Sequence, residues 1–397
     1  MTKGALDGVK IVDLSRMAPG PFCSMMLGDM GADVIKVEAP PTSRIIASKI
    51  INDAETRKKA ASNPLNRNKR SIVLDLKEKD GIKILHQLCQ KADVFIEGFR
   101  PEVVTRLGCN YETIKEINPS IIYCSISGYG QTGPYKDLVG HDVNYISVGG
   151  ALGLIGSKNG TPSIPYNLIA DFAAGGMNAA YSIVCALFSR TNTGRGQKID
   201  TSMSDGVTYL LSAISGEYFN SGLIPKPGQM TLNGGVPYYN VFECQDGKYI
   251  SLGCIEPNFW KNLCSTLNLE QFASSQHNEH EYQLIMRELE ATFKTKKRDE
   301  WWDIFREAED VAAAPVYEFN EVLDDPHMKA RNMFIEAGSV DGAVITQVGF
   351  GSKLTDTPGA VRNLGTIPGA HSENILREIG YSADEIKKMV DSEVVFT

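Results

Sequence analysis

The first 130 residues alternate short apolar strand patterns with helical patterns, and this alternation restricts the fold more than any other feature. Strands are expected at 9–14, 34–37, 71–75, 94–96 and 121–126. Residues 21–30 and 79–92 have helical patterns between them, and the second carries the apolar stripe Ile82, Ile84, Leu85, Leu88 and Cys89. Strands that alternate with helices form mostly parallel sheets covered by those helices. The sequence therefore predicts an α/β fold.

The character of the chain changes after Gly228. Residues 238–243 and 248–252 flank Gln245-Asp246-Gly247, which predicts a β-hairpin with an Asp-Gly turn. Residues 256–320 are helical and charged in pattern, and a final helix is expected at 383–391. We predict a large domain at 1–202, a linker at 203–232 and a small α+β domain at 233–322. Residues 323–397 are a linker and a C-terminal segment that returns to the large domain.

Charge and cysteine usage narrow the class of protein. The net charge of −8 argues against nucleic-acid binding through overall basicity. The eight cysteines include no C-x-x-C pair, so we expect no zinc site and no disulfide framework, but free thiols in a reducing compartment. The N-terminus has no apolar signal core and the C-terminus no Ser-Lys-Leu signal, so we expect a cytoplasmic protein without a membrane partner.

The longest apolar run, residues 172–188, contains Gly175-Gly176 and Asn178. A membrane span usually needs about 20 apolar residues. We therefore predict a buried helix here.

A glycine pattern of the dinucleotide-binding type occurs at Gly128-Tyr-Gly130-Gln-Thr-Gly133, directly after a predicted strand. Its context does not fit that function. Pro134 follows, no apolar helix opens, and no acidic residue ends a second strand about 20 positions later. The pattern instead indicates a glycine-rich turn over a pocket.

Cationic residues gather near the ends of the predicted strands. Asn66-Arg67-Asn68-Lys69-Arg70 precedes one strand, and Lys77, Arg100 and Arg106 come from neighbouring segments. One interpretation is a solvated charged turn. The other is that these cations, Lys69 and Arg70 among them, bind the phosphates of a nucleotide.

Three residues are candidates for acid–base chemistry. His141 follows Gly140 at the edge of a glycine-rich turn, and a structural histidine is an equally open interpretation. Asp171 precedes the apolar helix, as a capping residue or as a carboxylate at the positive end of the helix dipole. Free N–H groups there are expected to stabilise an enolate oxygen. Glu256 precedes Pro257, either as a surface residue or as the partner of a histidine. Two bases on opposite sides of a carbon suit proton abstraction beside a carbonyl.

Short motifs extend from about Leu6 to the C-terminal helix. In the first part of the chain they are Ala18-Pro-Gly-Pro-Phe22, Gly31-Ala-Asp-Val-Ile-Lys-Val-Glu38, Asn68-Lys-Arg-Ser71, Leu74-Asp-Leu-Lys77 and Glu97-Gly-Phe-Arg-Pro101. They continue with Gly128-Tyr-Gly-Gln-Thr-Gly-Pro134, Gly140-His-Asp-Val-Asn-Tyr145, Ala170-Asp171, Thr193-Gly-Arg-Gly-Gln197, Gly234-Gly-Val-Pro-Tyr-Tyr239, Ile255-Glu-Pro257 and Asp325-Pro-His327. Together these motifs resemble those of the α-methylacyl-CoA racemases of the family III CoA-transferase (CaiB/BaiF) superfamily.

The resemblance implies an interlocked homodimer with a Rossmann-like large domain and a smaller domain. It also implies an acyl-CoA substrate and no separate cofactor. His141 and Asp171 match the two bases of the racemases, and Glu256 matches the carboxylate that partners the histidine. The positions assigned to CoA binding are Lys69, Arg70, Lys77, Phe99, Arg106, Gly140, Asp142, Tyr145 and Asn167. The arginine common after Lys36-Val37-Glu38 is replaced by Ala39, which removes one expected phosphate contact.

Two reactions are compatible with the resemblance. A racemase interconverts R and S 2-methylacyl-CoA thioesters by proton transfer through an enolate. A CoA-transferase uses the residue at Asp171 as a nucleophile. The combination of His141 and Glu256 favours the racemase, because transferases of the superfamily usually lack it. A non-catalytic CoA-binding protein is a third interpretation, against which the complete set of three residues argues.

Overall fold

The computed structural model describes residues 3–40 and 53–396. The chain divides into two compact units. The first unit comprises Met1–Gly149, Tyr166–Leu210 and His327–Thr397, and the second comprises Gly150–Pro165 and Leu211–Pro326. Each unit is described by itself below.

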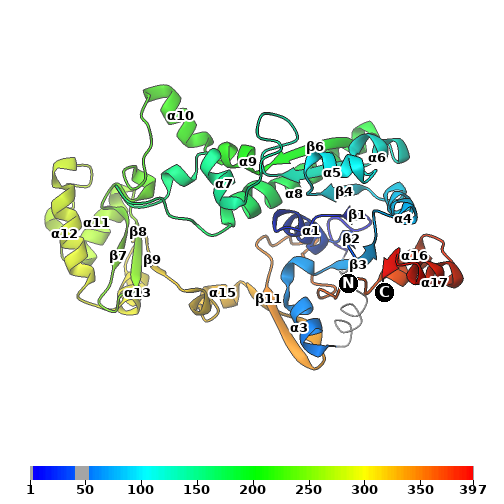
Figure 1. The fold of residues 1–397 in the computed structure, drawn as a ribbon. Coiled ribbons are helices and arrows are strands. Elements are labelled where there is room, and N and C mark those ends of the chain that lie inside the picture. Colours follow the sequence, from blue (N-terminus) through cyan, green and yellow to red (C-terminus); the bar gives the residue numbers. More distant parts are fainter. Residues whose placement is uncertain (1–2, 41–52, 397) are drawn as a thin grey trace. The chain divides into compact units, whose positions relative to one another are not determined.

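The first unit is built on a mainly parallel sheet, which confirms the predicted α/β class (Figure 1). Within the described residues this sheet has seven strands in the order β12-β3-β2-β1-β4-β5-β6. Their bounds are β1 (Lys10–Asp13), β2 (Asp33–Glu38), β3 (Lys69–Leu74), β4 (Val94–Glu97), β5 (Ile122–Ser127), β6 (Gln197–Ser202) and β12 (Val395–Phe396). All neighbours pair in parallel except β12, which is antiparallel to β3. The chain reverses its direction of winding between β1 and β4, where open α/β sheets bind ligands.

Helices cover both faces of the sheet because apolar side chains point alternately to either side of its buried strands. One face carries Ile11, Val34 and Ile96 and packs against α1 (Pro19–Asp29) and α8 (Asn178–Thr193). The opposite face packs against helices that supply Leu85, Ile114, Ile375 and Ile386 to the same cluster. These helices are α4 (Lys79–Gln90), α6 (Tyr111–Ile117), α16 (Ser372–Glu378) and α17 (Ala383–Asp391).

The long apolar helix is only partly buried, which corrects the prediction of a buried helix. It consists of the π-helix η3 (Leu168–Met177) followed by α8. Together, Leu168–Thr193 are long and apolar enough to cross a membrane by length and composition alone. However, α8 places Ala179, Ile183 and Leu187 in the core against the sheet, as core helices do. The other side of the continuous helix exposes a stripe at helical spacing, which starts at Met177 of η3 and continues with Tyr181, Val184 and Phe188 of α8.

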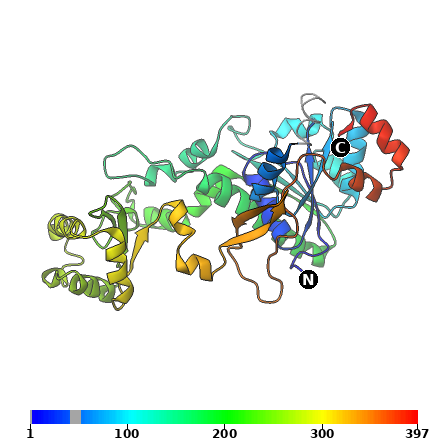
Figure 2. The same cartoon turned by 90° about the horizontal axis from the view of Figure 1, so that it is seen from below.

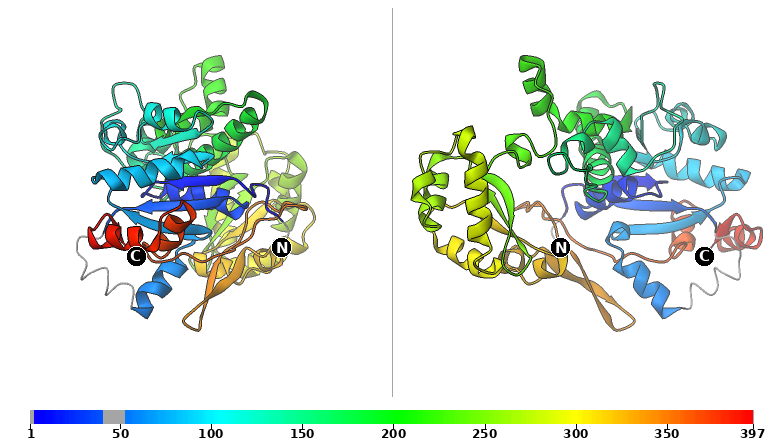
Figure 3. Two further views of the ribbon diagram at one scale, coloured as in Figure 1. Left: turned by 90° about the vertical axis from the view of Figure 1, so that its right-hand side faces the viewer. Right: turned by 60° about the vertical axis from the view of Figure 1, so that its left-hand side comes forward.

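The C-terminal segment returns to the large sheet, as expected from the sequence. In Figure 2 the last helices, coloured red, lie beside the sheet, and α16 contacts β3. Val395 pairs with Leu74 through β12, and the Asn68 N–H donates to the carbonyl of Asn363. The antiparallel hairpin β10 (Phe334–Val340) and β11 (Ala343–Val348) packs against α3 (Ala54–Ser62), as Figure 3 shows.

The second unit has its own core. Strands β7 (Tyr239–Glu243), β8 (Tyr249–Gly253) and β9 (Ala313–Val316) form an antiparallel sheet, and the predicted hairpin with Gly247 at a positive φ of 76° is confirmed. Large aromatic side chains fill the space beside this sheet, namely Phe242, Trp260, Phe293, Trp301 and Phe305. They come from β7, α11 (Pro257–Thr266), α12 (Tyr282–Phe293) and α13 (Arg298–Glu307).

The remaining elements are short. They are α5 (Pro101–Arg106), α7 (Asp142–Val148), α9 (Met203–Leu210), α10 (Ser212–Ser221), α14 (Phe319–Val322), α15 (Pro326–Ala330), and the 3-10 turns η1 (Pro64–Asn66), η2 (Leu152–Leu154), η4 (Thr231–Asn233), η5 (Glu270–Phe272) and η6 (Glu279–Glu281). The helices α9 and α10 follow each other closely in sequence but belong to different units.

Candidate active site

His141 lies at the start of α7 with its side chain exposed. It is the N-cap residue, and its carbonyl accepts hydrogen bonds from the N–H groups of Asn144 at 2.8 Å and Tyr145 at 3.2 Å. The side chain of Asn144 accepts the His141 N–H in return, at 3.1 Å. Because both backbone groups of His141 are bonded, its position is fixed while its imidazole remains accessible.

Asp142 joins this turn to the helix that carries Asp171. Its side chain is 5% exposed, and Oδ2 accepts the N–H groups of Ala170 at 2.8 Å and Asp171 at 2.9 Å. One carboxylate therefore binds the start of η3 directly beside His141. This contact brings His141 and Asp171 together, and their role as two bases remains a prediction.

Asp171 is half-buried, and its pKa is raised. Burial is the main cause, and the negative charge of Asp142 adds to it. A hydrogen bond from Asn167 Nδ2 to Asp171 Oδ2, 2.9 Å long, and the nearby His141 both lower the pKa. A carboxyl group with a raised pKa is a stronger base once ionised, which suits proton abstraction.

Two expectations about Asp171 are wrong. The helix begins at Leu168 with Asn167 as its N-cap, so Asp171 lies within the first turn and is not the capping residue. The N–H groups of Ala170 and Asp171 are not free for an enolate oxygen, because both donate to Asp142. The capping carboxylate comes from a residue distant in sequence, and local sequence patterns do not reveal such a contact.

Small residues allow close packing around η3. A Cβ atom on Gly176 would lie 2.8 Å from the Phe22 ring, and one on Gly206 of α9 would lie 2.6 Å from the carbonyl oxygen of Ala174. Neither distance is possible for a real side chain, so α1 and α9 approach the π-helix only because these positions are glycine. The tight packing holds the turn that carries Asp171.

The glycine pattern 128–133 serves the packing of Tyr145. A Cβ atom on Gly128 would lie 2.3 Å from the Tyr145 ring, and one on Gly140 would lie 2.8 Å from it. The Tyr145 hydroxyl donates to the carbonyl of Gly140 at 2.5 Å, and burial raises the pKa of Tyr145 to about 12. Tyr145 and Gly140 thus support the turn before His141, and the turn is the glycine-rich one expected from the sequence.

Gly128→Ala is expected to lower the free energy of unfolding by about 1–3 kcal/mol, because the new methyl group overlaps the Tyr145 ring. Urea unfolding measures this change. Gly216→Ala is the matched control, because a Cβ atom on Gly216 in α10 meets nothing within 4 Å. Equal stabilities of the Gly128 variant and the wild type would contradict the proposed packing.

A cavity of about 400 Å³ lies in the first unit at the carboxyl ends of its strands. Its apolar lining includes Leu14, Val37, Leu74, Leu76, Phe99 and Leu107. Arg16 lies over the Phe99 ring at 5.4 Å from its centroid, and Lys77 also lines the cavity. This is the position, between β1 and β4, where open α/β sheets bind nucleotides.

Sequence reasoning missed Arg16. The position of Arg16 soon after the first predicted strand could have identified it, because ligands bind at that end of the sheet. Ala39, which stands where an arginine is common, lines the same cavity as Arg16. Arg16 therefore supplies a cation where the expected one is absent.

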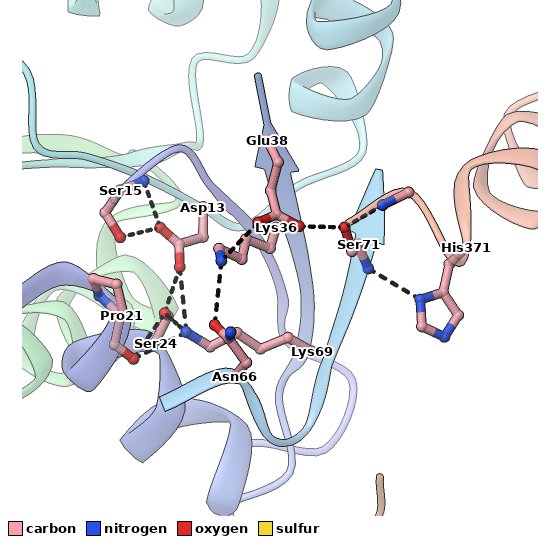
Figure 4. A network of polar contacts seen from close by, with 11 residues as sticks. Asp13, Ser15, Pro21, Ser24, Lys36, Glu38, Asn66, Lys69, Ser71 and His371 are labelled. Atoms are coloured by element: carbon pink, nitrogen blue, oxygen red, sulfur yellow. Dashed lines mark hydrogen bonds and ion pairs between the residues drawn. The ribbon is translucent and has the colours of Figure 1, made fainter. Parts of the chain in front are cut away.

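The cations at the start of β3 fit neither interpretation drawn from the sequence, and Figure 4 shows this for Lys69. Lys69 is 3% exposed; its Nζ donates to Ser24 Oγ at 2.6 Å and lies 3.6 Å from Asp13 Oδ2. Burial lowers its pKa to about 8, while Asp13 acts in the opposite direction. Arg67 is 2% exposed and forms a two-pronged ion pair with Asp29. These side chains belong to the core beneath α1, so Lys69 is not placed to bind a phosphate.

Arg70 is also engaged within the protein. Its guanidinium lies 2.7 Å from both Asp33 Oδ2 and Glu378 Oε1. It therefore links β2 and α16 to β3 and does not line the cavity that holds Lys77. Arg106 is exposed at the end of α5, beside Leu107 of the cavity wall, and remains a predicted phosphate contact.

Glu97 is a buried carboxyl group next to the Phe99 wall of the cavity. It is 1% exposed and accepts the Phe99 N–H at 2.8 Å. Burial raises its pKa to about 7, although hydrogen bonds from Ser125 and Phe99 act against this shift. The folded protein therefore holds this proton at pH values where the unfolded chain has lost it.

Because the pKa of Glu97 rises from 4.5 to about 7 on folding, the free energy of unfolding is expected to fall between these pH values. At about 1.4 kcal/mol per pKa unit the total is on the order of 3 kcal/mol. Glu97→Gln removes this contribution, so the free energy of unfolding of the variant is expected to depend less on pH. Urea unfolding at pH 5 and pH 8 measures it, with the exposed Glu102→Gln as control. An unchanged pH dependence in Glu97→Gln would disprove the assignment.

Glu256 belongs to the second unit. It is the N-cap residue of α11, with an exposed side chain and with Pro257 in the first helical turn. Its interaction with His141 remains a prediction.

The sequence profile of CoA-transferase family III matches residues 6–372, and the chain belongs to this family. The chain is 36% identical to the α-methylacyl-CoA racemase of Homo sapiens over 394 residues, which cover 98% of this chain and 97% of the relative. It is 31% identical to a succinate–glutarate CoA-transferase of Agrobacterium fabrum over 393 residues, covering 95% and 96%. A crystal structure of a CaiB/BaiF family protein from Brucella suis has a TM-score of 0.79 at 28% identity and covers 96% of this chain and 100% of that chain. Racemases and CoA-transferases thus both occur among the relatives.

Proposed function

We propose that this protein is a racemase of 2-methylacyl-CoA thioesters. The observation that supports this most is the position of His141 beside Asp171, joined through Asp142. The imidazole is accessible and the carboxyl group is half-buried. A CoA-transferase that uses Asp171 as a nucleophile has no evident need for a second base at this point.

In the proposed mechanism, the thioester acidifies the α-hydrogen of the acyl group. One of the two bases removes this proton, and the other delivers a proton to the opposite face of the planar enolate. Glu256 is proposed to stabilise the protonated form of His141. The reaction needs no cofactor, because CoA is part of the substrate.

The 400 Å³ cavity is proposed to bind the adenosine end of CoA. Phe99 offers an aromatic wall to the adenine, and Lys77 and Arg16 offer positive charge to the phosphates. Arg106 is a further phosphate contact suggested by the family.

Lys77→Ala is expected to raise the Kd of CoA by about tenfold, because a charge-assisted contact contributes about 1.5 kcal/mol. Isothermal titration calorimetry with CoA tests this. The neighbouring Lys79→Ala is the control, since Lys79 does not line the cavity. The wild-type affinity is expected to fall more steeply with salt than that of the Lys77 variant, because salt screens the lost contact. Equal affinities for wild type and Lys77→Ala would place the phosphates elsewhere.

The alternative is an acyl-CoA:carboxylate CoA-transferase with Asp171 as nucleophile. The half-buried Asp171 and the transferases among the relatives favour it. Incubation with a 2-methylacyl-CoA in D₂O, without an acceptor acid, separates the two reactions. A racemase is expected to incorporate deuterium at the α-carbon and to interconvert the R and S forms. Absence of exchange, with an acyl or CoA adduct on Asp171 that hydroxylamine traps, would establish the transferase.

We also propose a homodimer in the cytoplasm. The side chains of Met177, Tyr181, Val184 and Phe188 are exposed, and an exposed apolar patch can mark an interaction surface. A second copy of the chain is the partner that the family suggests. The eight cysteines are all free thiols, which suits a reducing compartment.

A further inference from the structure

The last residue of strand β2 is acidic, and this residue, Glu38, lines the cavity of about 400 Å³ in the first unit. Without β12, the sheet has the strand order 3-2-1-4-5-6, which is that of dinucleotide-binding sheets. In those sheets an Asp or Glu that ends the second strand accepts a hydrogen bond from the 2′-hydroxyl of the adenosine ribose. Glu38 therefore stands where such sheets recognise a ribose.

The carboxylate of Glu38 is held by two donors, as Figure 4 shows. Lys36 Nζ donates to Oε1 at 2.9 Å, and Ser71 Oγ donates to Oε2 at 2.5 Å. Ser71 is itself fixed, because its N–H donates to His371 Nδ1 at 3.1 Å and its Oγ accepts the N–H of Gly369 at 2.8 Å. These contacts orient the carboxylate before a ligand binds, which lowers the entropic cost of binding.

The chemistry of this carboxylate suits a hydroxyl group. A carboxylate accepts about four hydrogen bonds, so Glu38 is able to accept more than those from Lys36 and Ser71. Its side chain is 19% exposed and therefore partly accessible. The Lys36 ammonium compensates its charge, and Lys77 and Arg16 of the cavity offer positive charge to the phosphates of a ligand.

We propose that Glu38 recognises the ribose at the adenosine end of CoA by accepting a hydrogen bond from its 2′-hydroxyl. The ribose of CoA carries its phosphate on the 3′-oxygen, which leaves the 2′-hydroxyl free to donate. Glu38 thereby selects CoA against nucleotides that lack this hydroxyl or carry a phosphate on it. This inference rests on the proposed CoA site in the cavity, and it holds for a racemase and for a CoA-transferase alike.

Isothermal titration calorimetry on the wild-type protein tests the proposal with three ligands. They are adenosine 3′,5′-bisphosphate, its 2′-deoxy analogue and adenosine 2′,5′-bisphosphate. The second lacks only the hydroxyl, and the third has the same phosphates with one of them on the 2′-oxygen. The first ligand is expected to bind about tenfold more tightly than either of the others, because a hydrogen bond to a charged group changes Kd by about this factor.

Glu38→Gln keeps the size of the side chain and removes its charge. It is expected to reduce the preference for the 2′-hydroxyl to about threefold or less, because hydrogen bonds to a neutral acceptor are weaker. Glu78→Gln is the matched control, since Glu78 is close in sequence but is not among the described residues that line the cavity. Lys77→Ala is expected to weaken the binding of all three ligands and to keep the preference for the hydroxyl.

Equal affinities of the wild type for adenosine 3′,5′-bisphosphate and its 2′-deoxy analogue would overturn the inference, and this comparison needs no variant to fold. A tenfold preference that persists in Glu38→Gln, or that disappears equally in Glu78→Gln, would also overturn it. If none of the three nucleotides binds, the inference fails together with the adenosine site. The racemase reaction is tested separately by exchange in D₂O. Exchange without a preference for the hydroxyl refutes the inference alone, and a preference that depends on Glu38 without exchange refutes the racemase alone.

Discussion

Asp171→Asn is expected to lower the rate of racemisation by about 10²–10⁴-fold, the usual contribution of a general base. The substitution preserves the shape of the side chain and removes the proton acceptor. In a two-base mechanism, Asp171→Asn does not affect racemisation and the exchange of the α-hydrogen equally. Exchange of the α-hydrogen with D₂O is expected to stop for the enantiomer whose proton faces Asp171. The other enantiomer keeps its exchange, because His141 removes its proton and returns a deuteron to the same face.

The measurement is deuterium incorporation from each enantiomer separately, followed by mass spectrometry and chiral analysis. Asp137→Asn is the control, because Asp137 is an exposed carboxylate that forms an ion pair with Lys136. Asn167→Ala tests how the surroundings of Asp171 set its pKa, since it removes the hydrogen bond that lowers this pKa. The acid limb of the pH–rate profile is then expected to move to higher pH. Racemisation at the wild-type rate in Asp171→Asn would refute a catalytic role for this carboxylate.

The fold was largely predictable because its main determinants are local. The strands β1 to β5 are short apolar runs, and α4 carries the amphipathic stripe that places Ile84, Leu85 and Leu88 in the core. The hairpin turn follows from Asp246-Gly247. The return of β12 to β3 could be expected only in outline, because a strand as short as Val395–Phe396 leaves no clear pattern in the sequence.

The errors come from contacts between residues distant in sequence. A cluster of cations before β3 has the appearance of a surface turn, but Asp13 and Asp29 are buried in the same region and pair with Lys69 and Arg67. Buried ion pairs of this kind depend on the tertiary fold and not on local charge. For the same reason the sequence suggested Asp171 as the helix cap, although Asp142 accepts the N–H groups.

The sequence predicted which residues gather at the candidate site but not how they are supported. His141 and Asp171 lie near each other, as His141 lowers the pKa of Asp171, and their role as two bases remains a prediction. Two residues predicted to bind CoA also support the site from within the protein, and their contacts with CoA remain a prediction. Tyr145 holds the carbonyl of Gly140, and Asn167 holds the carboxylate of Asp171. These supporting roles need the three-dimensional arrangement of α7 and η3, which no spacing in the sequence specifies.

His141 is the residue on which the choice between the two reactions depends. Asp171 is needed by a racemase as a base and by a transferase as a nucleophile, so its loss inactivates both. In the proposed racemase mechanism the imidazole at the start of α7 transfers a proton, and the transferase mechanism does not use it. Its removal therefore separates the two mechanisms more sharply than any other single substitution.

His141→Ala is expected to lower racemisation by about 10²–10⁴-fold and to reverse the exchange pattern of Asp171→Asn. Exchange in D₂O stops for the enantiomer that the Asp171 variant still exchanges, and it continues for the other one through Asp171. His280→Ala is the control, because His280 is exposed in the 3-10 turn η6 of the second unit. Opposite patterns in the two variants establish one base on each face of the substrate carbon. Full exchange of both enantiomers in His141→Ala would exclude the histidine as a base, and CoA transfer to an acceptor acid by that variant would then assign the site to the transferase reaction.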